Sequence, residues 1–154
     1  MSKYIFFIFL IFFFFSCRDS NTSLLPSKIN FPDQESWGVT ILLTKEGKLR
    51  AKIESGHLEK YNKKEFTILN QSVKVKFYDK LENPSSVITS KSAEVDQASN
   101  NMKAIGNVVA VSDSGITLHS ETLTYNSKEE RLSTKDNIKI TTLEADTLYG
   151  IGFE

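Results

Sequence analysis

The side chains that most often carry catalysis are few and scattered in this sequence. His57 and His119 are the only histidines, and each stands alone among polar residues, which predicts solvated surface positions rather than metal ligands. The sequence contains no HExxH, GxSxG or phosphate-loop pattern. A pair of carboxylates for glycoside hydrolysis is an alternative that the sequence leaves open. Acidic residues on polar faces, here Glu94, Asp96, Glu121 and Asp146, are more commonly solvated charges. We therefore predict no enzyme activity, no metal site and no cofactor.

Cys17 is the residue whose type and position indicate a specific modification. It is the only cysteine, so no disulfide can form within the chain. It follows Lys3 and an unbroken apolar run from Tyr4 to Phe15. A helix of that length rises about 18 Å, short of the roughly 30 Å hydrocarbon core of a bilayer. We therefore predict that residues 1–16 are a signal peptide.

The stretch Phe14-Phe15-Ser16-Cys17 is similar to a bacterial lipobox, whose pattern is Leu, a small or apolar residue, Gly, Ala or Ser, and then Cys. Ser16 and Cys17 match this pattern, whereas Phe14 replaces Leu and Phe15 is bulky. The similarity implies that a diacylglycerol is attached to the Cys17 thiol and that the chain is cleaved before it, which anchors the protein to a membrane. An uncleaved, slightly longer N-terminal helix and a plain secretory signal are the alternatives.

The rest of the chain divides into a linker and one domain. Residues 17–36 contain Pro26 and Pro32 and show little periodicity, which predicts a flexible linker between the lipidated N-terminus and a domain at 37–154. The 154 residues have room for one hydrophobic core. Lys+Arg and Asp+Glu number 19 each, and this balance argues against a nucleic-acid partner.

Apolar residues in the domain alternate with polar ones. Val73, Val75 and Phe77 alternate with polar residues and Tyr78, and Ile138 and Ile140 flank Lys139. A period of two is typical of strands with one apolar and one solvated face. Turn-forming pairs such as Glu46-Gly47, Asn83-Pro84 and Asp136-Asn137 separate these runs. The pattern predicts an all-β domain, which is a sandwich, a roll or a barrel.

A loose internal repeat adds detail to this prediction. Each copy has an apolar residue, four mostly polar residues and a second apolar residue, in Ile88–Ala93, Leu118–Leu123 and Leu143–Leu148. A step of five residues places the two apolar side chains on opposite faces of a regular strand. Both can face inward only if the strand carries a bulge or a bend. Repeated bends of this kind would roll the sheet into a curved structure.

Several strand-and-turn segments, in this order and spacing, resemble those of the LptC family. They are Val75-Lys-Phe-Tyr-Asp79, Thr89-Ser-Lys-Ser-Ala-Glu-Val-Asp96, Gly106-Asn-Val-Val-Ala-Val111, Gly115-Ile-Thr-Leu-His-Ser-Glu-Thr-Leu123 and Leu148-Tyr-Gly-Ile-Gly-Phe153. The resemblance covers roughly residues 40–154. It implies a twisted, partly open β-jelly roll of short antiparallel strands, the fold of OstA, LptA and LptC proteins.

The resemblance also implies a function and partners. The domain would receive lipopolysaccharide from the inner-membrane Lpt ABC transporter and pass it to an LptA-like periplasmic bridge protein. Its location would be the periplasm, at the periplasmic face of the inner membrane. The anchor departs from the family, because familiar members use an uncleaved transmembrane helix. The alternative is an adaptor lipoprotein that binds other proteins through its sheet edges and carries no lipid.

Inward-facing apolar residues are the candidates for contact with acyl chains, although ordinary core packing is the alternative role of each. They are Val73, Val75, Phe77, Val109, Val111, Leu118, Leu123, Ile138 and Ile140. The last strand is the candidate edge for a partner, with Leu148, Tyr149, Gly150, Ile151, Gly152 and Phe153, because unpaired backbone groups at an edge can pair with another strand. The first strand, Gly38 to Thr44, would present the other edge.

Overall fold

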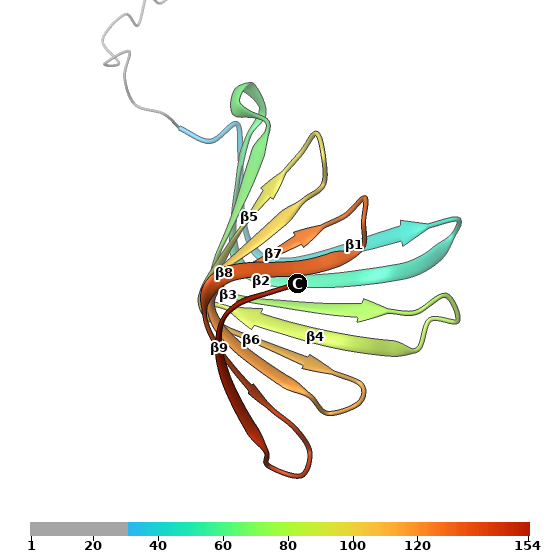
Figure 1. Cartoon of the computed structure of the whole chain (residues 1–154). Coiled ribbons are helices and arrows are strands. Elements are labelled where there is room, and N and C mark those ends of the chain that lie inside the picture. The colour runs from blue at the N-terminus through green and yellow to red at the C-terminus, as the bar shows by residue number, and fades with distance from the viewer. Residues whose placement is uncertain (1–30) are drawn as a thin grey trace, which may run out of the picture. The chain divides into compact units, whose positions relative to one another are not determined.

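The computed structural model describes residues 31–154, which fold as a single antiparallel sheet (Figure 1). The prediction of an all-β jelly-roll domain is confirmed. The strands are β1 Gln34–Lys45, β2 Lys48–Tyr61, β3 Phe66–Tyr78, β4 Pro84–Ser90, β5 Ser92–Asp96, β6 Met102–Ser112, β7 Thr117–Asn126, β8 Arg131–Thr141 and β9 Thr147–Phe153, and a short 3-10 helix spans Asn62–Lys64. Among these described residues no helix is long and apolar enough to cross a bilayer.

The order of strands in the sheet is β1-β2-β3-β4-β6-β7-β8-β9. The remaining strand, β5, pairs with β3 and β6, as β4 does, but with different segments of them. The strands β4 and β5 are thus two parts of one long strand that is interrupted at Lys91. Because neighbours in sequence are neighbours in the sheet, the first and last strands lie at its two edges.

The first strand begins earlier than the predicted domain boundary. Gln34, Glu35 and Ser36 pair with residues of β2, although the sequence placed them in the linker. The turn at the far end of β2 ties this segment down, because the Asn62 amide donates a hydrogen bond to the Asp33 carboxylate at 2.8 Å. The edge formed by β1 is therefore longer than the predicted Gly38–Thr44.

A line of irregular residues crosses the sheet and bends the strands near their middles (Figure 1). The residues with positive φ on this line are Gly38, Gln71, Ser72, Gly106, Asn107 and Gly152. An extra residue in one strand makes it bend and twist, and glycine or asparagine tolerates positive φ. The bends divide the sheet into two facing halves. Half A contains 34–37, 57–61, 66–70, 92–96, 102–105, 122–126 and 131–134, and half B contains the remaining strand segments from 39 to 151.

Serine hydroxyl groups stabilise the bend in alternate strands. The Ser55 hydroxyl donates to the His57 carbonyl at 2.9 Å, that of Ser90 to the Ser92 carbonyl at 2.8 Å, and that of Ser120 to the Thr122 carbonyl at 2.9 Å. Each bond spans two residues across the bend, where the regular ladder is interrupted. A buried serine therefore satisfies a backbone carbonyl that the neighbouring strand does not reach.

This geometry explains the internal repeat. Ile88 and Ala93 are both buried, as are Leu118 and Leu123, so the predicted bend between apolar positions five residues apart is confirmed. The third proposed copy is wrong, because Leu143 lies in the turn between β8 and β9, Leu148 lies at the start of β9, and both are exposed. The true third copy is 53–58 on β2, whose apolar ends are also buried.

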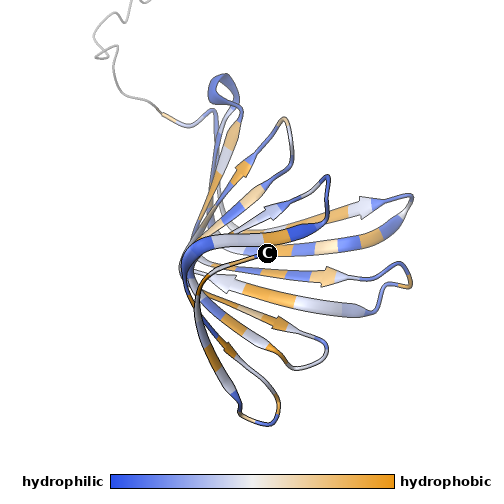
Figure 2. Cartoon of the chain, viewed as in Figure 1, coloured by the Kyte–Doolittle hydropathy of each residue, from blue (hydrophilic) through white to orange (hydrophobic). Residues whose placement is uncertain are grey.

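The core lies where the two halves meet along the inside of the bend. Leu69 and Leu123 from half A and Val73, Val75, Ile88 and Val108 from half B are the largest fully buried side chains. Apolar and polar residues alternate along the strands, as Figure 2 shows. The apolar residues of this alternating pattern thus lie on one face of each half. The bend of the sheet brings these two apolar faces together, away from water.

Replacing Gly56 with alanine is expected to destabilise the domain by about 1–3 kcal/mol, the usual cost of overpacking a close-packed site. A Cβ at Gly56 would lie 2.6 Å from the carbonyl oxygen and 2.7 Å from the Cβ of Gln71, so the bend of β3 would have to shift. The measurement is urea unfolding followed by circular dichroism. Gly150→Ala is the control, because its Cβ would lie no closer than 3.6 Å to its nearest neighbour, Ile138. Equal unfolding midpoints for the two variants would contradict the prediction.

Candidate functional site

The two halves leave a cavity between them at the β1 end of the sheet. This inner chamber has a volume of about 470 Å³. Its lining residues are Gln34, Ile41, Leu43, Ala51, Ile53, Leu58, Lys60, Thr67, Leu69, Val75, Phe77, Val95, Gln97, Asn100, Met102 and Tyr125. Most of them are apolar, and the charged or amide side chains come from strand ends and turns. The volume lies within the roughly 300–1,000 Å³ of small-molecule sites in proteins.

A second cavity of about 630 Å³ adjoins the inner chamber and has a more polar rim. We call it the outer cavity. Leu43, Ala51, Phe77, Asn100 and Tyr125 line both spaces. The other residues around the outer cavity are Thr44, Lys45, Arg50, Tyr78, Asp79, Ser85, Ser86, Ser127, Glu130 and Leu132. The interior of the roll is therefore packed along the bend and unfilled between the halves farther out.

Two aromatic rings lie at the boundary between these spaces. Phe77 on β3 comes from half B and Tyr125 on β7 from half A, and their ring centroids are 5.2 Å apart at an interplanar angle of 50°. Such a tilted pair is a favourable arrangement of aromatic rings. Burial raises the pKa of the Tyr125 phenol, and the negative charge of Glu130 raises it further. The phenol therefore stays neutral at physiological pH, as an apolar lining requires.

Seven of the nine predicted groove residues point into the interior of the roll. Val75 and Phe77 line the inner chamber. The others belong to the core or pack against it, namely Val73, Leu118, Leu123, Ile138 and Ile140. These five residues are surrounded by other core side chains, as the alternative of ordinary core packing predicted. The chamber residues that the sequence did not single out lie mainly on β1 and β2, where the strand pattern was less regular.

Val109 and Val111 do not point inward, which corrects the prediction for these two residues. Val108 is 1% exposed and Ala110 is also buried, whereas Val111 is 38% exposed. Met102 and Ala104 are buried before the bulge at Gly106 and Asn107, and Val108 and Ala110 are buried after it, so the alternation of β6 continues through the bulge with the even-numbered residues facing inward. The two valines therefore lie on the outer surface of half B.

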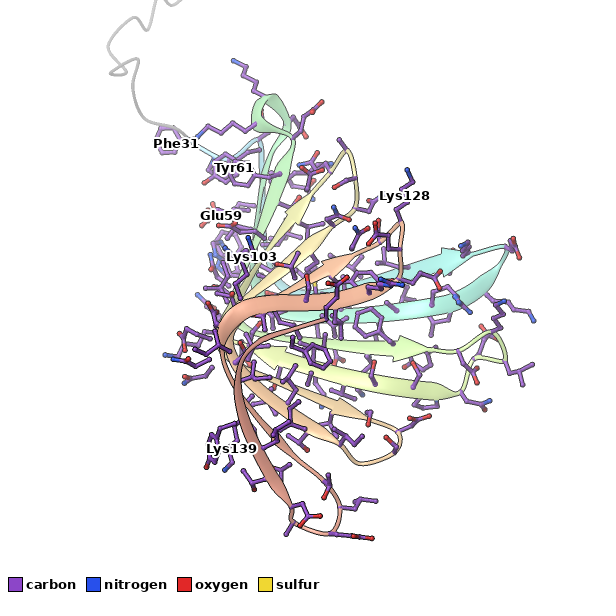
Figure 3. All side chains as sticks on the ribbon, viewed as in Figure 1. Phe31, Glu59, Tyr61, Lys103, Lys128 and Lys139 are labelled. Atoms are coloured by element: carbon purple, nitrogen blue, oxygen red, sulfur yellow. The ribbon has the colours of Figure 1, made fainter. Side chains whose placement is uncertain are left out.

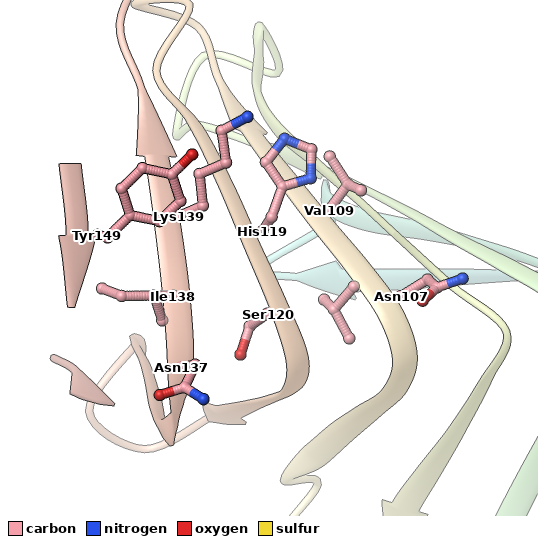
Figure 4. Close-up of a pocket in the computed structure, with 9 residues that line it drawn as sticks. Asn107, Val109, His119, Ser120, Asn137, Ile138, Lys139 and Tyr149 are labelled. Atoms are coloured by element: carbon pink, nitrogen blue, oxygen red, sulfur yellow. The ribbon is translucent and has the colours of Figure 1, made fainter. Parts of the chain in front are cut away.

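The outer surface near the last strands carries a shallow groove of about 420 Å³. Val109, His119, Lys139 and Tyr149 line it and are successive cross-strand neighbours on β6, β7, β8 and β9 (Figure 4). His119 is exposed there, as predicted. Lys139 projects outward, as do Glu59 and Lys103 on the other half of the sheet (Figure 3).

His57 is buried rather than solvated, which corrects that prediction. Its Nε2 lies 2.8 Å from Glu35 Oε1, its Nδ1 lies 3.6 Å from Glu59 Oε1, and its ring stacks on Trp37 at 5.1 Å. His57, Glu35 and Glu59 place possible ligand atoms within 4.8 Å of one another. The two carboxylates, however, approach different ring nitrogens, whereas a single ion would need both on the same side of the ring. The hydrogen bond between His57 and Glu35 and the stacking of Trp37 on the His57 ring tie β1 to β2.

Among the strands that the structure describes, the last, β9, lies at an edge of the sheet and pairs only with β8. Leu148, Tyr149 and Ile151 are exposed, and Ile151 is the most exposed of them at 81%. Gly150 and Gly152 separate these apolar side chains, and Phe153 ends the strand. An edge with several exposed apolar side chains is a surface on which another strand can pair. Cys17, the predicted signal peptide and most of the predicted linker lie outside the described residues.

Comparison with known proteins agrees with the resemblance found in the sequence. A family model described as lipopolysaccharide-assembly, LptC-related, matches residues 7–154. No curated protein matches the chain. Because the family match covers nearly the whole sequence, the chain belongs to the LptC family, a periplasmic and inner-membrane-associated component that takes part in lipopolysaccharide transport with other Lpt proteins.

Proposed function

We propose that this domain carries lipopolysaccharide by enclosing acyl chain in the inner chamber. The observation that supports the proposal is an apolar cavity of about 470 Å³ between two halves of a sheet whose bend is otherwise tightly packed. A filled roll could bind proteins but would have no space for hydrocarbon. The chamber walls come from Ile41, Ile53, Leu58, Val75 and Val95, among others, and these side chains match the chemistry of an acyl chain.

The energy of hydration explains why such a chamber is needed. Each methylene group moved out of water gains roughly 0.8 kcal/mol, so a chain of about a dozen carbons costs on the order of 10 kcal/mol to leave exposed. A lipid that crosses an aqueous compartment must therefore be shielded. The sequence contains no phosphate-loop pattern, so the energy for movement comes from the inner-membrane Lpt ABC transporter.

The proposed partners bind at the two ends of the roll. Lipopolysaccharide enters from the transporter and leaves past β9 to an LptA-like bridge protein, whose jelly roll pairs with that edge. The exposed side chains of Leu148, Tyr149 and Ile151 support this assignment, because pairing would remove them from water. The lipid on Cys17 and the linker 17–36 would hold the domain at the periplasmic face of the inner membrane after removal of residues 1–16.

Photo-crosslinking tests whether lipid occupies the chamber. A benzophenone amino acid placed at Ile41 or at Val75, which line the chamber, is expected to form adducts with lipopolysaccharide in bacterial cells. The matched controls are Lys74 and Val111, which lie on the outer surface, and we expect no adducts from them. Equal labelling at inner and outer positions would refute lipid carriage. Protein adducts alone, formed from β9, would favour the adaptor function instead.

Replacing Ile151 with lysine is expected to weaken binding of the LptA-like partner by about tenfold or more. An ammonium group buried without a counter-charge at an interface costs more than the roughly 1.4 kcal/mol that corresponds to a tenfold change. Ile151 is exposed in the isolated domain, so its own fold should tolerate the change. The measurement is co-purification and titration of the two proteins. Leu81→Lys, at an equally exposed turn position, is the control, and equal losses for both variants would argue against pairing at β9.

A further inference from the structure

The two cavities within the roll share a boundary at which one side chain comes from each half. Phe77 extends from half B and Tyr125 from half A, and their rings meet at a centroid distance of 5.2 Å. Both cavities take walls from β1, β2 and β3, but the outer cavity also reaches β4 through Ser85 and Ser86 and β8 through Leu132, which the inner chamber does not. The ring pair thus lies between the inner chamber and the part of the interior that reaches β4 and β8.

The neighbours of Phe77 leave space for its ring to move. Its cross-strand neighbours are Ala51 on β2 and Ser86 on β4, which are both small. Tyr125, in contrast, lies between Met102 on β6 and Leu132 on β8, which are long side chains. Side-chain rotation at Phe77 is therefore less hindered than at Tyr125. Because the two residues lie on different halves and are not hydrogen-bonded neighbours in the sheet, their rings can separate without breaking the ladder.

From this arrangement we infer that Phe77 and Tyr125 form an aromatic gate that controls the passage of a hydrocarbon chain between the inner chamber and the outer cavity. With the rings in contact, a chain in the inner chamber ends at the pair. With the rings apart, the two spaces are continuous and the chain can extend toward β4 and β8. The inference rests on the proposed lipid-carrying function and adds to it the residues that divide the path.

The test compares lipopolysaccharide adducts on the two sides of the gate in the full-length chain. Benzophenone amino acids at Ile41, in the inner chamber, and at Leu132, in the outer cavity, report the two spaces. The variants Phe77→Ala and Tyr125→Ala each remove one ring. Each is expected to raise the ratio of Leu132 adducts to Ile41 adducts by about threefold to tenfold, because the energy of an aromatic pair corresponds to a factor of this size. Phe77→Leu, which keeps apolar bulk without the ring, should give a smaller rise.

The control is a second aromatic pair outside the cavities. Tyr61 and Phe66 stack at 5.0 Å and line neither space, so Tyr61→Ala and Phe66→Ala should leave the ratio unchanged. An unchanged ratio in the Phe77 and Tyr125 variants, or a parallel loss of both adducts in folded protein, would overturn the gate. Absence of adducts at Ile41 in the otherwise native chain would instead overturn the proposed function, and the gate with it.

Discussion

Replacing Leu123 with alanine is expected to lower the free energy of unfolding by about 3–5 kcal/mol, a large share of the roughly 5–15 kcal/mol that stabilises a typical domain. Leu123 is 1% exposed, lies directly after the bend of β7 and pairs with Ala104, which is also buried. The small neighbouring side chain cannot expand into the space that Leu123 would leave. The substitution therefore creates a cavity where the two halves are most tightly packed.

The measurement is urea unfolding of the variant and of the unmodified protein under identical conditions. Leu143→Ala is the informative control, because the predicted repeat made Leu143, like Leu123, an inward-facing apolar end of a copy. Leu143 is 79% exposed, so its loss should change the stability by no more than about 0.5 kcal/mol. If the two variants unfolded at the same urea concentration, the assignment of the bend and of the core around it would be wrong.

Replacing Cys17 with serine is expected to release the protein from the membrane and to abolish lipopolysaccharide transport. Serine lacks the thiol to which a diacylglycerol is attached, and two acyl chains are what turns weak membrane binding into stable anchoring. Membrane fractionation and incorporation of a labelled fatty acid measure the two parts of this prediction. Ser16→Ala is the control, because alanine is also accepted before the cysteine of a lipobox, so lipidation should persist.

The outcome separates the alternatives for the N-terminus. A Cys17→Ser variant that stays in the membrane without incorporating lipid would indicate that the apolar run from Tyr4 to Phe15 is itself the anchor. A plain secretory signal would leave both the unmodified protein and the variant in the soluble fraction. Neither result would change the β domain, whose strands begin at Gln34.

The repeat illustrates how far sequence patterns determine this fold. A period of two identifies strands because successive side chains point to opposite faces, and a five-residue step between apolar positions demands a bend. Both deductions hold at Ile88–Ala93 and Leu118–Leu123, because every residue involved is local in sequence. The copy at 53–58 was recognisable by the same rule, since Ser55 precedes the second apolar residue as Ser90 and Ser120 do.

The same local reasoning does not decide between two adjacent apolar residues. Val108 and Val109 are adjacent and equally apolar, so the sequence alone does not choose which of them faces inward. The structure decides it, because Met102, Ala104, Val108 and Ala110 all face inward, and this depends on how β6 pairs with β7 on one side and with β4 and β5 on the other. His57 is comparable, because only the pairing of β1 with β2 places Glu35 and Trp37 over its ring.

By itself the sequence determined that the domain is all-β, that its strands bend, and that its order of segments is that of the LptC family. Local alternation, turn residues and spacing contain that information, because each depends on a few neighbouring residues. Only the tertiary structure decided that a chamber stays unfilled and that Phe77 meets Tyr125 across it. A cavity is the volume left over by side chains from β1, β2, β3, β5, β6 and β7 together, so the distance between the two halves determines it.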